Sequence, residues 1–199
     1  MLVLAIPLIA LRPDAVRASI EAAEQSVATV QRFGNAALGI LRDRMLTVEQ
    51  RNRSFATLLN TYFDLGIISR RVLGPAWERT TSRERVHFRQ VFTNFIVASY
   101  AARFESAQLE ALKVRNATIQ SKNSALVSSE LWLPAAAPLR VDWQLVRQNR
   151  TWRIIDVTVD GVGLTKRHRD DFATVIQRAG LAGLIRKLQA AAVPTRAGT

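Results

Sequence analysis

The amino-acid sequence predicts a single α+β domain, in which a curved, four-stranded antiparallel sheet packs against several helices. Apolar side chains recur at helical spacing through the first half of the chain, whereas short β-rich segments separated by turn residues occupy residues 109–159. The last of these segments leads through a Gly-x-Gly turn into two more helical runs. Helices that follow a final strand in this way can return onto one face of the sheet, and 199 residues suffice to bury a core between the layers.

Three helical patterns precede the predicted sheet. Residues 19–46 form the first, with apolar side chains at steps of three and four. The second begins near Phe55 and continues without a break to Gly74-Pro75, which end it. Ser82 is the predicted N-cap of the third, an aromatic-rich helix.

Four strands are predicted at residues 109–120, 125–133, 139–147 and 151–159. The third alternates cleanly between apolar and polar side chains, as a strand with one buried face does. Because the connections are short, we expect an antiparallel meander. Gly161 and Gly163 then allow the chain to turn off the sheet, and Gly180 is expected to end the first of two closing helices.

The sequence offers few groups for catalysis. It has no cysteine and no spacing of histidines or carboxylates typical of a metal site, so we predict no catalytic residue, metal or cofactor. His87 and His168 lie among arginines on predicted helices and are expected to face solvent. Asp156 is the one carboxylate inside an apolar strand, and we expect an arginine or backbone donors to hold it. The alternative is a small enzyme that uses Asp156 as a general base.

The net charge of +12 indicates an acidic partner or surface. The basic residues are scattered singly or in pairs, and no RNA-binding or helix-turn-helix signature is recognisable. We therefore predict no nucleic-acid partner. A binder of nucleic acid or acidic protein remains a third hypothesis, and it predicts an affinity that collapses with added salt.

The first ten residues, MLVLAIPLIA, are nearly all apolar, but the run is too short to cross a bilayer core of about 30 Å as a helix. It is typical of the central part of a secretory signal peptide, with Val16-Arg17-Ala18 as the cleavage site. We predict a signal peptide at residues 1–18, shortened at its start because no basic segment precedes the run, and one domain at residues 19–199. The alternative is a buried N-terminal helix.

Several motifs resemble those of a known family in their order along the chain. The last strand and its turn carry W-R-I-I-D-V and G-V, the next helix carries K-x-x-R-x-x-F, and the closing helix carries G-x-x-x-L-I-x-x-L. Upstream lie VLGPAW and FRQVFTNFIVASYAARF. Together they resemble the Mla/toluene-tolerance family of periplasmic lipid-binding proteins over roughly residues 27–190, and the second upstream segment is most similar to the hopanoid-biosynthesis-associated branch. Gly163 stands where the family usually has serine, which puts any role for a turn hydroxyl in doubt.

The resemblance implies an NTF2/cystatin-like cone with an apolar pocket between sheet and helices. It further implies a monomeric periplasmic carrier, not an enzyme, that holds a phospholipid or a hopanoid-like lipid. Such a carrier would shuttle its cargo between an inner-membrane ABC-type or other lipid transport complex and an outer-membrane lipoprotein complex.

The resemblance also turns the inward-facing apolar residues into candidate lipid contacts, although the same rings at helical spacing would otherwise indicate a filled core. The candidates are Leu59, Tyr62, Phe63, Phe88, Phe92, Phe95, Ile96, Tyr100, Leu131, Val141, Trp143, Leu145, Ile155 and Val157. The cations expected to contact a head group or a partner protein are Lys166, Arg167 and Arg169.

Overall fold

The computed structural model describes residues 13–106 and 108–192, and it confirms the α+β fold. The helices are α1 (Pro13–Arg42), α2 (Val48–Tyr62), α3 (Leu65–Leu73), the 3₁₀ helix η1 (Gly74–Arg79), α4 (Ser82–Ser106) and α5 (Leu164–Ala192). The strands are β1 (Ala111–Ser121), β2 (Ser124–Trp132), β3 (Leu139–Gln148), β4 (Thr151–Val159) and β5 (Val162–Gly163). The first four agree closely with the predicted strands.

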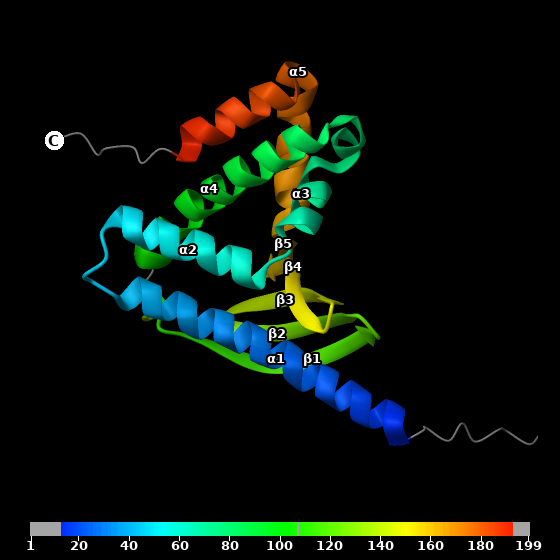
Figure 1. Cartoon of the computed structure of the whole chain (residues 1–199). Coiled ribbons are helices and arrows are strands. Elements are labelled where there is room, and N and C mark those ends of the chain that lie inside the picture. The colour runs from blue at the N-terminus through cyan, green and yellow to red at the C-terminus, as the bar shows by residue number, and fades with distance from the viewer. Residues whose placement is uncertain (1–12, 107, 193–199) are drawn as a thin grey trace, which may run out of the picture.

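The five strands pair antiparallel in sequence order, which confirms the predicted meander. In the middle of the sheet Ser129 lies opposite Val141, and Trp143 lies opposite Val157. Figure 1 shows the helices as successive layers above the sheet: α1 lies along it, α2 follows, and α4 and the end of α5 lie beyond. Buried apolar side chains of these helices and of the sheet pack together into the main core.

The fifth strand was not predicted, and it arises from the turn after β4. Asp160 and Gly161 both have positive φ, at 46° and 82°. This turn reverses the chain, so that Val162 and Gly163 pair with Val159 and Thr158. The chain then enters α5 directly at the edge of the sheet.

The predicted continuous helix from Phe55 to Gly74 is wrong, because the chain breaks between α2 and α3. At the break Phe63 forms a parallel bridge to Ile154, and the Asp64 N–H donates to the Ile154 carbonyl at 2.9 Å. The Asp64 side chain then caps α3 by accepting from the Ile67 N–H at 2.8 Å. Pairing with the edge of β4 is thus what interrupts the helical pattern.

Two more side chains hold the α2–α3 region on β4. Arg153 donates to the carbonyls of Thr61 and Asn60, at 2.7 and 2.9 Å, and so satisfies acceptors that the end of α2 leaves open. Arg71 of α3 reaches the Ile155 carbonyl at 3.2 Å. The helix pair is therefore fastened to the strand at three successive points along the chain.

Helix boundaries also differ from the predictions elsewhere: α1 ends at Arg42 rather than at residue 46, and α2 begins at Val48 rather than near Phe55. Thr81, not Ser82, caps α4: its hydroxyl accepts from the Glu84 N–H at 3.2 Å, while the Glu84 carboxylate accepts from the Thr81 N–H at 2.8 Å. Helix α1 begins at Pro13, so the predicted cleavage site at residues 16–18 lies within it. The rest of the predicted signal peptide, residues 1–12, lies outside the described residues.

Helix α5 is kinked at Gly180, where φ is 67° and ψ is −178°. Only glycine adopts this conformation at little cost. The kink divides α5 into a first segment, residues 164–179, and a second segment, residues 181–192, which lies beside α4 (Figure 1). The predicted stop at Gly180 followed by a closing helix is thereby confirmed.

None of the helices in residues 13–106 and 108–192 combines the length and apolar character that crossing a membrane requires.

Candidate functional site

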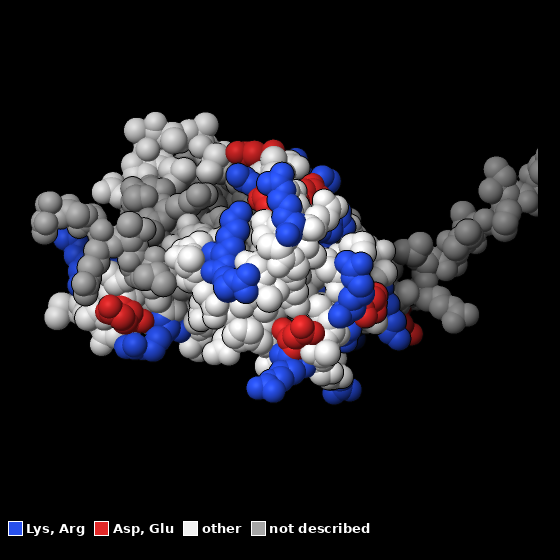
Figure 2. Space-filling model, turned by 90° about the horizontal axis from the view of Figure 1, so that it is seen from above, with Lys and Arg blue, Asp and Glu red and all other residues white. Residues whose placement is uncertain are grey.

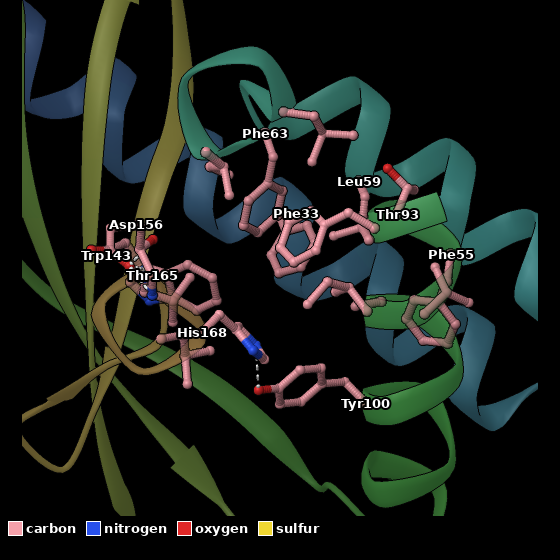
Figure 3. A pocket seen from close by; sticks show the side chains of 18 of the residues that line it. Phe33, Phe55, Leu59, Phe63, Thr93, Tyr100, Trp143, Asp156, Thr165 and His168 are labelled. Atoms are coloured by element: carbon pink, nitrogen blue, oxygen red, sulfur yellow. Dashed lines mark hydrogen bonds between the residues drawn. The ribbon is translucent and has the colours of Figure 1, made fainter. Parts of the chain in front are cut away.

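A cavity of about 180 Å³ lies between the inner face of the sheet and the helices. All five α-helices and strands β1 to β4 contribute side chains to its wall, and Figure 3 shows part of this lining around one space. The described lining residues are Phe33, Gly34, Ala37, Leu41, Phe55, Leu59, Phe63, Leu65, Ile68, Val72, Phe92, Thr93, Ile96, Val97, Tyr100, Leu109, Leu112, Leu131, Trp143, Asp156, Val157, Leu164, Thr165 and His168. Most of them are apolar, so the cavity suits hydrocarbon.

Phe33 of α1 is the central ring of the aromatic wall. Its centroid lies 5.1 Å from that of Phe63, 5.5 Å from that of Trp143 and 5.9 Å from that of Tyr62, all in edge-to-face arrangements. Such pairs stabilise beyond their buried area. The three contacts join α1, the α2–α3 break and the sheet, and they hold one side of the cavity in a fixed shape.

The polar atom of Trp143 is satisfied within the sheet. Its indole Nε1–H donates to the Ser129 hydroxyl at 2.8 Å, and that hydroxyl donates to the Val141 carbonyl at 3.2 Å. Ser129 is almost completely buried, at 1% exposure. Because buried donors need partners, this chain of hydrogen bonds allows a tryptophan to contribute an apolar surface to the cavity.

Asp156 is the carboxylate in the lining, and the start of α5 holds it. One carboxylate oxygen accepts from the Thr165 hydroxyl at 2.7 Å, from the Thr165 N–H at 3.1 Å and from the Val157 N–H at 2.8 Å. The expected backbone donors are thus present. Accepting an N–H from the first turn of a helix is a stabilising arrangement for a carboxylate, so Asp156 joins β4 to α5.

His168 is buried, at 9% exposure, and the expectation that it faces solvent is wrong. The first segment of α5 packs against α4, which places the imidazole among the rings of Phe92, Phe95 and Phe172 at centroid distances of 5.5 to 6.0 Å. Its Nε2 lies 3.3 Å from the Tyr100 hydroxyl, as Figure 3 shows. Burial lowers the pKa of His168, and the Arg167 charge adds to this, whereas Asp171 acts in the opposite direction. His87 is exposed, as expected.

The structure divides the predicted lipid contacts into two groups. Those that line the cavity are Leu59, Phe63, Phe92, Ile96, Tyr100, Leu131, Trp143 and Val157. Those that do not line it are Tyr62, Phe88, Phe95, Val141, Leu145 and Ile155. Phe88, for example, is fully buried and stacks on Phe92 at 5.6 Å, so it belongs to the filled core behind the wall.

The three predicted head-group cations lie in different surroundings. Lys166 forms an ion pair with Asp170 at 2.7 Å. Arg169 lays its aliphatic stem over Gly74, where an added Cβ would lie 3.3 Å from the Arg169 Cδ. Arg167 lines a groove between α4 and α5.

The predicted lipid contacts include no residue of α1, although this helix lines the cavity. Phe33, Ala37 and Leu41 line the cavity at steps of four, a spacing that places them on one helix face. Gly34 lies on the same side, and a Cβ there would approach Leu112 of β1 to 3.1 Å. The glycine thus lets α1 lie close to the sheet, and the spacing is the signal that identifies this face.

Figure 2 shows Lys and Arg side chains distributed over one face of the molecule with Asp and Glu between them, rather than as one continuous basic patch. Among the described residues no group of three or more histidine and carboxylate side chains is arranged to hold a metal ion.

Comparison with known proteins gives a family match and structural matches. The family model of the MlaC protein matches residues 31–190, and no curated protein matches the sequence. Among solved structures, the chain is similar to the phospholipid-binding protein from Ralstonia solanacearum in complex with a phospholipid. The two share 17% sequence identity with a TM-score of 0.75, over 84% of this chain and 97% of that one. At this level of identity the likeness shows a common fold.

Proposed function

Because the chain belongs to the MlaC protein family, we propose that it is a lipid carrier whose cavity binds the acyl chains of a phospholipid. The observation that carries the proposal is the apolar cavity between sheet and helices, in a fold shared with a phospholipid-binding protein. The family and that neighbour point to binding rather than to catalysis. The contacts of Asp156 agree, since Thr165 and Val157 already hold its carboxylate.

A carrier of this kind needs no reacting group. Moving a diacyl lipid with about 30 methylenes into water costs on the order of 24 kcal/mol, at roughly 0.8 kcal/mol per methylene. A protein that buries most of those methylenes removes most of this barrier to transfer through water. We assign the acyl contacts to the predicted residues that line the cavity, together with Phe33 of α1.

The first test is native mass spectrometry of the protein purified from a bacterial host, followed by solvent extraction of whatever is bound. A stoichiometric adduct that extracts as phospholipid is the expected result. An adduct that extracts as a hopanoid would identify a different cargo but would still support a lipid carrier. We expect a phospholipid because the structural neighbour is in complex with one. A bare protein that also takes up no labelled phospholipid from vesicles would contradict the proposal.

A cavity-filling variant tests the location of the site. Ile96→Trp adds an indole to the wall and is expected to lower phospholipid occupancy at least several-fold while the protein stays folded. Ile20→Trp is the matched control, because Ile20 is 55% exposed on α1, away from the cavity. Equal occupancy in the two variants would show that the lipid binds elsewhere.

We further propose that the carrier works in the periplasm as a monomer, after removal of residues 1–18. All described residues before Ala22 are exposed, so cleavage there would leave every buried side chain of α1 in place. Its partners would be an inner-membrane ABC-type or other lipid transport complex and an outer-membrane lipoprotein complex. Fractionation of cells, with sequencing of the mature N-terminus, tests the first part; co-purification with membrane complexes tests the second.

A further inference from the structure

A second hollow, a groove of about 880 Å³, runs between α4 and the two segments of α5. The kink at Gly180 creates it by turning the second segment back along α4 (Figure 1). Its apolar floor includes Phe95, Phe172, Val175, Leu184 and Leu188. Its charged residues are Arg167, Asp170, Asp171, Arg178 and Lys187.

Tyr100 and His168 line both this groove and the inner cavity. Each projects from one of the two helices that bound the groove, and the two side chains meet at 3.3 Å. Figure 3 shows the pair at the border of the cavity. This hydrogen-bonded contact therefore lies where the two hollows adjoin.

We propose that the groove between α4 and α5 binds the phosphate end of the lipid whose acyl chains enter the cavity, an inference that rests on the proposed function. Tyr100 and His168 separate when the lipid binds, so that one lipid occupies both hollows. The cavity alone, at about 180 Å³, is smaller than the roughly 300–1,000 Å³ of typical ligand pockets. An ionised phosphate also cannot enter an apolar cavity without charged or hydrogen-bonding partners. The groove supplies both the additional space and the partners.

The charges of the groove favour an anion. Arg167, Arg178 and Lys187 are exposed, and none forms an ion pair with a described residue. Of the two opposing carboxylates, Asp170 is already held by Lys166 at 2.7 Å, which leaves Asp171 against three cations. Cation–phosphate hydrogen bonds are among the stronger polar contacts that proteins form.

Another hollow that adjoins the cavity is less suited to phosphate. It lies between α2, α4 and the second segment of α5, and it shares Val97 with the cavity wall. Its lining has a single arginine, Arg53, among mainly amide and apolar side chains. Charge therefore favours the α4/α5 groove.

The chain has no cysteine, so one dye can be placed at one position. Thr174→Cys puts a bimane dye in the groove, and Ala173→Cys puts it on the neighbouring exposed residue that does not line the groove. Each protein is loaded with phosphatidylcholine that carries a nitroxide either on the head group or near the end of one acyl chain. Quenching of the dye reports which end of the lipid is close.

The head-group nitroxide is expected to quench the dye at position 174 at least twofold more than the chain-end nitroxide does, and at least twofold more than it quenches the dye at position 173. Equal or reversed quenching in a protein that carries lipid by native mass spectrometry would overturn the groove site and leave the carrier proposal intact. A protein without bound lipid would overturn both.

The role of the Tyr100–His168 contact between the two hollows is tested by the rate of lipid transfer from loaded protein to phosphatidylcholine vesicles. Tyr100→Phe removes the hydroxyl that meets His168 and is expected to speed transfer about two- to tenfold, the factor that one neutral hydrogen bond is worth. Thr57→Val, which removes an exposed hydroxyl on α2, is the control and should transfer at the wild-type rate. A Tyr100→Phe rate equal to that of the control would overturn the role of the pair.

Discussion

Replacing Asp156 tests whether this carboxylate joins the sheet to α5 or acts on a bound molecule. The side chain accepts three hydrogen bonds, two of them from Thr165 at the start of α5. A buried hydrogen bond to a charged group contributes about 1.5–3 kcal/mol. Because Asp156 is only half-buried and one of its three bonds is to the adjacent residue Val157, we expect Asp156→Ala to lower the free energy of unfolding by about 2–4 kcal/mol. Asp156→Asn keeps an acceptor for the Thr165 hydroxyl and should cost only about 1–2 kcal/mol.

Urea unfolding followed by tryptophan fluorescence measures both losses, and native mass spectrometry of the same samples measures lipid occupancy. The Asn variant is expected to keep its lipid, because its oxygen still faces Thr165. An Ala variant within about 0.5 kcal/mol of the wild type would refute the structural role, since that is the size of an ordinary surface substitution. An Asn variant of unchanged stability that loses its lipid would instead show that the carboxylate acts on the ligand.

Three further predictions concern His168, Phe33 and Gly180. Burial lowers the pKa of His168 below the unfolded value of 6.5, so the stability that the neutral imidazole contributes is complete above that pH and is lost as pH falls towards the folded pKa. Between about pH 7.5 and about pH 5.5, the range in which histidine titrates, the melting temperature should therefore fall more for the wild type than for His168→Gln. Parallel curves for the two proteins would contradict this. Phe33→Ala should cost about 3 kcal/mol in urea unfolding, from three ring contacts and a cavity, and Phe33→Leu clearly less; a loss below about 1 kcal/mol would contradict the central place of this ring. Gly180→Ala should cost about 1–3 kcal/mol through backbone strain alone, since nothing lies within 4 Å of an added Cβ. In Gly39→Ala, equally open but helical, stability should be equal or higher, so a loss shared by both variants would exclude strain at the kink.

The strands were predictable because alternation and turn residues are local signals. Trp143 and its neighbours on β3 alternate between apolar and polar types, and the pairing of β2, β3 and β4 follows from their short connections. The break at Phe63 was not predicted because both flanking segments continue the same apolar period. The local signal for the break is Asp64, an N-cap residue type that lies three residues before Ile67, whose amide it accepts from.

The cavity was predictable only in part, because periodicity gives the direction of a side chain and not its depth. Phe88 and Phe92 lie four residues apart on the same face of α4, yet only Phe92 reaches the cavity, because Phe88 stacks behind it. The burial of His168 depends on how α5 packs against α4, and the arginines beside it in the sequence indicate solvent. Such features are tertiary, and a single sequence does not encode them in its local pattern.

The three ties between β4 and the α2–α3 region have a consequence for how the protein deforms. The Asp64 amide and the Arg153 and Arg71 guanidinium groups fasten that side of the cavity to the sheet. Across the cavity, Tyr100 of α4 meets His168 of α5 at 3.3 Å, so this contact joins two helices to each other and not a helix to the sheet. In hydrogen-exchange terms, the backbone amides of Asp64 and β4 belong to the slow-exchanging part of the molecule whether or not a ligand is bound. The amides of α4 and of the first segment of α5 beyond Thr165, the residue that Asp156 holds, are those whose protection should change on loading. The wall of the cavity is thereby divided into a rigid part and a compliant part.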